Sequence, residues 1–223
     1  MSAPELTTVH LLRHGKVHNP DNVLYGRLPG YVLSRSGHAM ARAAADFLAG
    51  ADVAHLAASP LVRAQQTAEP MVERFGVPIV TDERLIEAGN SFQGRRMDRS
   101  TALELATRPW RWPALRDPFT PSWGEPYLDI AHRMLAAVSV AVQVAAGREA
   151  VLVSHQLPVY TVRRFLEGRR LWHDPRRRQC SLASLTSLHF RDGIYVGLSY
   201  AEPARHIAAE NDGDTTPAAG VAP

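Results

Sequence analysis

Short apolar runs bounded by turn residues alternate along the chain with longer stretches in which apolar residues recur at helical spacing. The runs predict strands over residues 9–12, 53–58, 79–81 and 150–153. Helices are predicted over 34–48, 60–75, 127–146 and 157–166, where Ser34 is a start signal and Gly76 and Gly147 are stop signals. Residues 181–190 and 194–200 flank Arg191-Asp192-Gly193, which predicts a hairpin.

This order of elements predicts an α/β fold. Strands that alternate with helices form a mostly parallel sheet covered on both faces, here a three-layer α/β/α sandwich with an antiparallel C-terminal hairpin. Residues 16–32 form a long loop, which in compact domains is usually functional or disordered. Residues 101–107 are a short helix candidate, and 109–121 are irregular and rich in proline.

We expect one domain over residues 1–202 and a disordered tail over 203–223, where Ala, Pro, Gly, Asp and Glu occur without periodicity. The role of the insertion at 88–126 is open, although its aromatic residues suit either a substrate pocket or simple anchoring. The N-terminus has no secretory pattern, and no apolar stretch looks long enough to cross a bilayer, so a cytoplasmic location is expected.

Composition adds limited information. The chain is 45% hydrophobic and 21% charged, which is ordinary for a globular protein, and Cys180 is its one cysteine, so no internal disulfide can form. The formal charge is +3, and Lys16 is the only lysine. Arginine binds phosphate through two N–H groups, so the bias suits phosphorylated ligands, but a general preference for arginine explains it equally well.

Two predicted strands end in a histidine, and this is the strongest chemical signal. Ligands of such sheets bind beyond the carboxyl ends of the strands, so His14 and His155 are expected in the same crevice. Arg13 and Gly15 flank His14. A neutral imidazole is a competent nucleophile toward phosphorus, and an adjacent arginine would neutralise the phosphoryl oxygens.

The segment His10-Leu-Leu-Arg-His-Gly15 resembles the signature of the histidine phosphatase superfamily, also called the phosphoglycerate mutase-like family. Three more similar segments follow in the family's order: residues 59–68, 84–89 with Gly94, and 151–155. Gly124, Glu125 and Arg133 also resemble a family pattern. Four ordered motifs across most of the chain are a specific signal.

The resemblance implies a metal-independent phosphatase without a cofactor, in which arginine and imidazolium take the role that magnesium has in kinases. It implies that the catalytic residues are His14, Glu87 (the general acid) and His155, and that the phosphate-binding residues are Arg13, Arg63, His155 and Asn19. Candidates for binding the rest of the substrate are Lys16, His18, Arg27 and Gln156. The sequence departs from the family pattern at residues 16–20. The identity of the substrate beyond its phosphate group is therefore not predicted.

Alternatives exist at several of these positions. Asp82, Glu83 and Glu125 are acidic candidates beside Glu87. The spacing of His10, His14 and His18 would suit a metal site on a helix, but the run is short and apolar, so His10 is expected in the core or on a sheet face. The arginines at 163, 164, 169, 170 and 176–178 could bind nucleic acid, but a solvated face is the better interpretation.

The sequence favours a phosphomonoesterase acting on a small phosphorylated metabolite, with neither nucleic acid nor membrane as partner. A mutase-type phosphotransferase is the first alternative, disfavoured because the interval between Glu87 and His155 is short. A non-catalytic phospholigand-binding protein is the second. The oligomeric state is open, a homodimer being one option.

Overall fold

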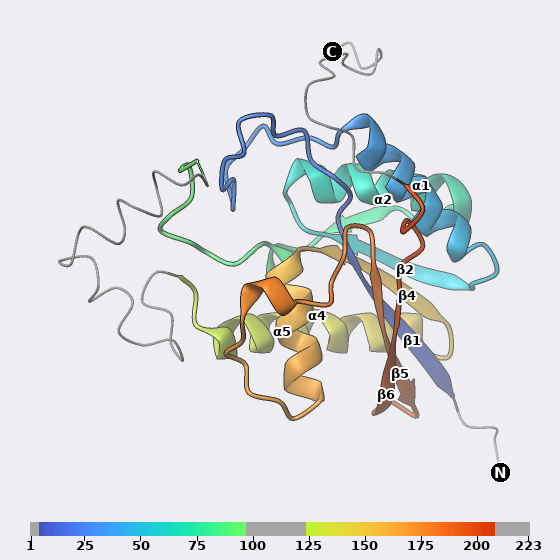
Figure 1. Ribbon diagram of the computed structural model, residues 1–223. Helices are drawn as coiled ribbons and strands as arrows, with labels where there is room; N and C mark the ends of the chain where they lie inside the picture. Colours follow the sequence, from blue (N-terminus) through green and yellow to red (C-terminus); the bar gives the residue numbers. More distant parts are fainter. Residues whose placement is uncertain (1–4, 97–123, 208–223) are drawn as a thin grey trace.

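The computed structural model describes residues 5–96 and 124–207 and contains one six-stranded sheet (Figure 1). The strands are β1 (Leu6–Arg13), β2 (Val53–Ala58), β3 (Ile79–Thr81), β4 (Glu149–Ser154), β5 (Leu185–Arg191) and β6 (Ile194–Ala201). Their order in the sheet is β3-β2-β4-β1-β5-β6. β1 to β4 run parallel, whereas β5 pairs antiparallel with β1 and β6 antiparallel with β5. The predicted α/β fold is therefore confirmed.

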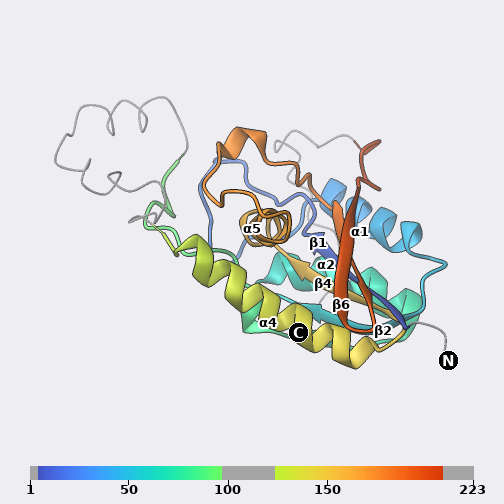
Figure 2. The ribbon, with the colours of Figure 1, turned by 90° about the horizontal axis from the view of Figure 1, so that it is seen from below.

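Helices cover both faces of this sheet. α1 (Arg35–Phe47) and α2 (Val62–Phe75) lie on one face, and α4 (Tyr127–Ala145) and α5 (Gln156–Leu166) on the other (Figures 1 and 2). Two short 3-10 helices, η1 (Glu83–Leu85) and η3 (Pro175–Arg177), lie in connections. Each face has its own apolar core, with Ala64 and Met71 of α2 in one and Ile130 and Met134 of α4 in the other, and all four are fully buried.

Local sequence signals explain where the elements begin and end. The Ser34 side chain caps α1 by accepting a hydrogen bond from the Gly37 amide at 3.1 Å. α2 ends at Gly76, which has a φ of 66°. The turn between β5 and β6 consists of Asp192 and Gly193, both at positive φ, as a tight hairpin requires. β5 begins at Leu185, later than the residue 181 predicted.

α4 corrects one expectation, because among the described residues it is the one helix long and apolar enough to cross a membrane by length and composition. It lies along the sheet, and its inward residues, including Ile130, Met134 and Ala141, are fully buried. Core helices pass the same test, and packing against the sheet accounts for the apolar residues on the inward face of α4.

The packed chain extends past residue 203, because Ala204 is buried against Met40 of α1 and Ala183. The tail prediction therefore concerns 208–223, which lies outside the described residues, as do the predicted helix at 101–107 and the irregular stretch at 109–121. Of the aromatic residues in the insertion, Trp110, Trp112 and Trp123 also lie outside them.

Candidate active site

His14 lies directly beyond the carboxyl end of β1 and is only 2% exposed. Its amide donates to the Ser154 carbonyl at 3.1 Å, and the Gly15 amide donates to Thr67 Oγ1 at the same distance. Gly15 is required by close packing, since a Cβ there would lie 2.5 Å from the Gly37 carbonyl oxygen of α1. The strand end is therefore fixed against both α1 and α2.

The His14 ring is held in one tautomer. Nδ1 lies 2.8 Å from the Gly15 carbonyl oxygen, which can only accept, so Nδ1 carries the hydrogen and Nε2 keeps its lone pair. Burial lowers the pKa of His14 well below its usual value, and the charges of Arg63 and Arg13 lower it further. His14 is therefore a neutral imidazole with a nucleophilic nitrogen at neutral pH.

His155 follows β4, caps α5 and faces His14. The two ring centroids are 5.1 Å apart with the planes inclined at 60°. His155 Nε2 lies 2.8 Å from Ser59 Oγ, and both residues are fully buried. Burial lowers the pKa of His155 well below its usual value, followed by the effects of His14, Arg63 and Arg13. The two predicted histidines thus lie against each other at the ends of the paired strands β1 and β4.

Three buried polar atoms of the histidine pair and its neighbouring arginines have no hydrogen-bond partner among the described residues: Arg13 Nε, Arg63 Nε and His155 Nδ1. Arg13 is anchored by NH1, which donates to the Cys180 carbonyl at 2.6 Å, and Arg63 by NH2, which donates to the Gly26 carbonyl at 2.7 Å. Buried donors are normally satisfied, so unpaired ones need an explanation. All three belong to the predicted phosphate-binding set, and an oxyanion would satisfy them.

Glu87 is the acidic residue that lies close to these arginines. Burial raises the pKa of its carboxyl group, although the Ala88 amide and the charges of Arg63, Arg13 and Arg178 oppose the rise. The other acidic candidates are engaged elsewhere or exposed. Asp82 binds Arg84, Glu83 is exposed on η1, and Glu125 binds Arg27 and Arg133.

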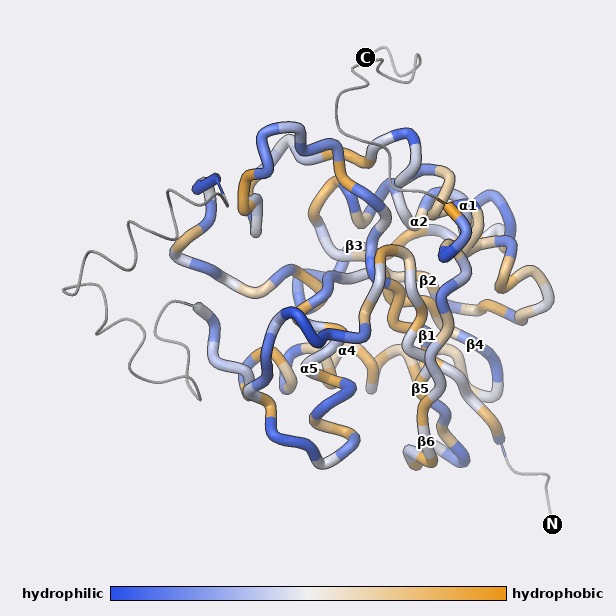
Figure 3. The backbone as a smooth tube through the Cα atoms, viewed as in Figure 1, coloured by the Kyte–Doolittle hydropathy of each residue, from blue (hydrophilic) through white to orange (hydrophobic). Residues whose placement is uncertain are grey.

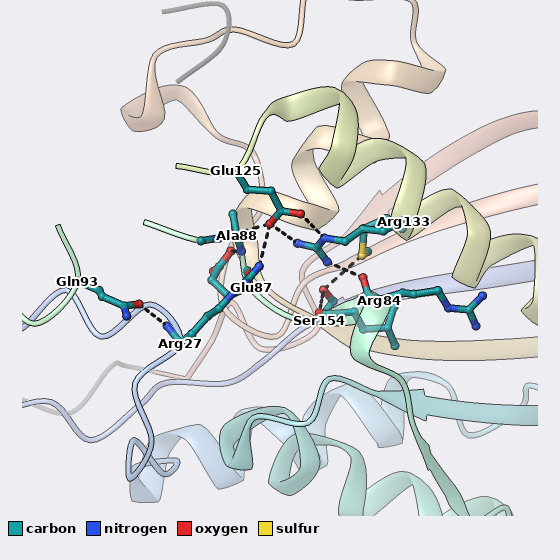
Figure 4. A network of polar contacts seen from close by, with 11 residues as sticks. Arg27, Arg84, Glu87, Ala88, Gln93, Glu125, Arg133 and Ser154 are labelled. Atoms are coloured by element: carbon teal, nitrogen blue, oxygen red, sulfur yellow. Dashed lines mark hydrogen bonds and ion pairs between the residues drawn. The ribbon is translucent and has the colours of Figure 1, made fainter. Parts of the chain in front are cut away.

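The segment that carries Glu87 is held by a polar network (Figure 4). The Glu125 carboxylate accepts from Arg27 NH2 at 2.8 Å and from Arg133 Nε at 2.6 Å. Arg27 Nε also donates to the Glu87 carbonyl at 2.6 Å, and Arg133 NH1 donates to the Arg84 carbonyl at 2.5 Å. The two arginines therefore hold this segment on either side of residue 86.

The remaining predicted site residues differ in what they contact. Arg27 holds the Glu87 segment instead of standing free for substrate. The Asn19 amide is engaged by the Val23 backbone through two hydrogen bonds, so it closes a loop in this structure. Gln156 Nε2 donates to the Cys180 carbonyl at 3.4 Å, beside the anchor of Arg13. Lys16 and His18 are half-buried in the loop after β1.

Sequence reasoning missed several residues that shape the site. Ser59 and Thr67 lie inside the second motif, at residues 59–68, so their place in that motif was a usable signal. Tyr25, whose ring centroid lies 4.8 Å from the Arg63 guanidinium carbon, had no signal. Arg178 was grouped with solvated arginines, yet it is half-buried and near Glu87.

His10 lies away from this site. Its ring bonds Ser187 Oγ at 2.7 Å and Glu149 at 2.6 Å across the sheet, as expected for a sheet-face residue. In the described part of the chain, no group of three or more His, Cys, Asp or Glu residues is arranged to hold a metal ion.

A buried histidine pair, two arginines and a carboxyl group with a raised pKa therefore lie together at the carboxyl ends of parallel strands. The sequence model of the histidine phosphatase superfamily (branch 1) matches residues 9–202, and the chain belongs to this family.

Known proteins resemble most of the chain. The uncharacterized protein Rv0525 of Mycobacterium tuberculosis is 54% identical over 201 residues, 90% of this chain and 98% of that protein. A Yersinia pestis protein named probable phosphoglycerate mutase GpmB is 30% identical over 93% of both chains. The structure of the mycobacterial glucosyl-3-phosphoglycerate phosphatase Rv2419c with VO3 has a TM-score of 0.65 and 30% identity, and covers 81% of this chain and 90% of that one.

Proposed function

We propose that this protein is a metal-independent phosphomonoesterase that forms a phosphohistidine on His14. The observation that carries the proposal is the set of three buried nitrogen atoms without a partner among the described residues, Arg13 Nε, Arg63 Nε and His155 Nδ1, near the His14 ring. A phosphoryl group would accept from all three. The charges of Arg13 and Arg63 act on His14 and would disfavour a divalent metal ion at this position, so metal independence is part of the proposal.

The first step transfers the phosphoryl group to the protein. His14 Nε2 donates its lone pair to phosphorus, the bond from phosphorus to the ester oxygen breaks, and Glu87 gives its proton to the departing oxygen. Arg13 and Arg63 stabilise the negative charge on the three peripheral oxygens. The alcohol leaves, and Glu87 is then a carboxylate.

The second step releases inorganic phosphate. Glu87 takes a proton from a water molecule as that water attacks phosphorus, and the phosphorus–nitrogen bond breaks with its electron pair returning to His14 Nε2. Both groups regain their starting protonation states, so the cycle balances without a metal or cofactor. The donors that face the phosphoryl group serve both steps.

The relatives' names favour two versions of this chemistry. One relative is named a phosphatase and another a probable mutase, and a mutase would return the phosphoryl group of His14 to a bound monophosphate. We favour hydrolysis because of the short interval between Glu87 and His155. The substrate we propose is a small phosphorylated metabolite in the cytoplasm, and nucleic acid or membrane binding is not part of the proposal.

The test is hydrolysis of p-nitrophenyl phosphate in EDTA from mildly acidic to neutral pH, with His14→Ala as the blank. Turnover by the wild type together with acid-labile phosphohistidine in a rapid quench supports the proposal. Phosphoglycerate interconversion that depends on a bisphosphate primer, at a rate above hydrolysis, would assign the mutase instead. Phosphate binding without turnover or phosphohistidine would leave a phospholigand-binding protein.

A further inference from the structure

Arg178 is an arginine near the proposed site that phosphoryl transfer leaves unused. It follows η3 in the connection between α5 and β5, a segment that is hydrophilic along much of its length (Figure 3). Its neighbours Arg176 and Arg177 are exposed, and Arg176 pairs with Asp174. Arg178 is half-buried, so its surroundings differ from those of the arginines before it.

The Arg178 guanidinium is held at one end by His173. Arg178 Nε donates to His173 Nε2 at 2.8 Å, while His173 Nδ1 lies 2.6 Å from the Leu171 carbonyl oxygen. Because that oxygen must accept, His173 has its hydrogen on Nδ1 and is neutral. Its ring packs between Tyr127 and Tyr160, with centroids 5.8 and 4.8 Å away. Arg178 is therefore positioned by a neutral, packed partner rather than by an ion pair.

The segment that carries Arg178 also touches the phosphate-binding residues. Two residues later, the Cys180 carbonyl accepts from Arg13 NH1 at 2.6 Å and from Gln156 Nε2 at 3.4 Å. Arg178 is also close enough to Glu87 and Tyr127 for their charges to affect its pKa, which burial lowers. Arg178 thus lies on the side of the site where Glu87 would protonate the leaving group.

Charge balance separates Arg178 from the phosphoryl group. Arg13 and Arg63 together offset the two charges of a phosphate monoester. The lowered pKa values of His14 and His155 keep both rings neutral, and Glu87 begins the proposed first step as a protonated acid, so these three groups add no charge at the start of the reaction. In the part of the chain that the structure describes, the Arg178 side chain makes one hydrogen bond, through Nε, and no carboxylate forms an ion pair with it.

We propose that Arg178 binds a second anionic group, a carboxylate or another phosphate, on the alcohol part of the substrate. The guanidinium edge formed by NH1 and NH2 matches such a group in geometry and charge. Arg178 would then determine specificity rather than take part in bond breaking. This inference rests on the proposed phosphatase function and narrows its substrate to phosphomonoesters with an additional negative charge.

The test compares two matched substrate pairs. 3-Phosphoglycerate differs from glycerol 3-phosphate in having a carboxylate for a hydroxymethyl group, and fructose 1,6-bisphosphate differs from fructose 6-phosphate by one phosphate. We expect Arg178→Gln to lower kcat/KM for the more anionic member of at least one pair about 10- to 100-fold, the usual range for a lost charged hydrogen bond. The less anionic members should change less than about 3-fold, and the pair that responds identifies the anion.

Arg178→Lys should restore part of the lost kcat/KM, because lysine keeps the positive charge but lacks the two N–H groups of the guanidinium edge. Arg177→Gln is the matched control, since it removes the same charge from an exposed neighbour and should leave all four substrates unchanged. Equal losses on both members of each pair, or equal effects of the two Gln variants, would overturn the inference. Turnover of p-nitrophenyl phosphate tests the proposed function separately. If it is absent, calorimetric binding of the same four compounds to wild type and Arg178→Gln still decides the role of Arg178.

Discussion

Ser59 Oγ lies 2.8 Å from His155 Nε2, and neither residue is exposed to solvent. The contact joins the segment after β2 to the histidine after β4, two neighbouring parallel strands. If the hydroxyl donates to Nε2, then His155 Nδ1, which has no partner in the described structure, carries the ring hydrogen. Ser59 would thereby determine which nitrogen of His155 presents a donor to the phosphoryl group.

Ser59→Ala is therefore expected to lower kcat about 10- to 100-fold with little change in KM, since a lost buried hydrogen bond is worth about 1–3 kcal/mol. The readout is steady-state kinetics with p-nitrophenyl phosphate. Thr161→Val is the control, because its hydroxyl is also buried and already lacks a partner. A kcat for Ser59→Ala as high as that of the control would show that the contact is only structural.

The pH dependence of kcat/KM follows from the directions of the pKa shifts. The lowered pKa of His14 keeps its imidazole neutral well below pH 6.5, so the rate should rise as His14 deprotonates on the acidic side. The raised pKa of Glu87 keeps it protonated above pH 4.5, so the rate should fall as Glu87 loses its proton on the basic side. Activity is therefore expected to be highest between these two ionisations.

Glu87→Gln should remove the basic limb of this profile and lower the rate with an alkyl phosphate by about 10²–10⁴-fold. The loss should be smaller with p-nitrophenyl phosphate, whose leaving group needs less protonation. The ionisation of the substrate is common to both proteins and cancels in the comparison. An unchanged basic limb in Glu87→Gln would assign the general acid to another residue.

The network around Glu125 predicts coupling to Glu87. Glu125→Gln weakens both arginine contacts that hold the Glu87 segment, so kcat should fall about 10-fold, a loss of about 1.4 kcal/mol in transition-state stabilisation. In a Glu87→Gln background the same substitution should have little further effect, because the group that it positions is already gone. Additive losses would contradict a positioning role.

Glu167→Gln is the matched control for Glu125→Gln, and it is measured in the wild type and in the Glu87→Gln background. Glu167 pairs with Arg163 at 2.9 Å and with Arg169 at 3.3 Å, outside the site. Surface ion pairs contribute about 0–1 kcal/mol to stability, so this variant should keep full activity in both backgrounds.

Much of the fold was predictable because its signals are local. The strand at 53–58 and the Asp192-Gly193 turn depend on apolar runs and turn preferences that neighbouring residues determine. The meeting of His14 and His155 was also predictable, because parallel strands bring their carboxyl ends to the same edge of the sheet. These two histidines needed only strand prediction and one rule of topology.

Other features depend on packing between distant segments. Arg178 is held by His173, whose ring contacts Tyr127 of α4 and Tyr160 of α5, and no periodicity in the sequence indicates these contacts. Arg27 was expected to contact substrate, but the Glu87 carbonyl and the Glu125 carboxylate engage it instead. In both cases the position of an arginine depends on the hydrogen-bond partner that a distant segment supplies, which the sequence does not reveal.

Gly37 ties the stability of the fold to the position of His14. A Cβ at residue 37 would lie 2.0 Å from the Lys16 carbonyl oxygen, and that oxygen also accepts from the Ser34 amide at 2.9 Å. Because the conflict is with backbone, no side-chain rotation can relieve it. Gly37→Ala must therefore push the start of α1 away from the segment that follows His14.

We expect Gly37→Ala to lower the free energy of unfolding by at least about 1–3 kcal/mol, the usual cost of overpacking, and to lower kcat as well. Gly50→Ala is the control, because a Cβ there meets nothing within 4 Å and the residue is not at positive φ. Replacing such a glycine restricts the unfolded chain and should change stability by less than about 1 kcal/mol, in the stabilising direction. Denaturant unfolding followed by circular dichroism measures the stability of both variants.

Equal unfolding midpoints for Gly37→Ala and Gly50→Ala would contradict this prediction. They would mean that the contact between α1 and the end of β1 is loose enough to accept a methyl group, and Gly37→Ala should then keep its kcat as well.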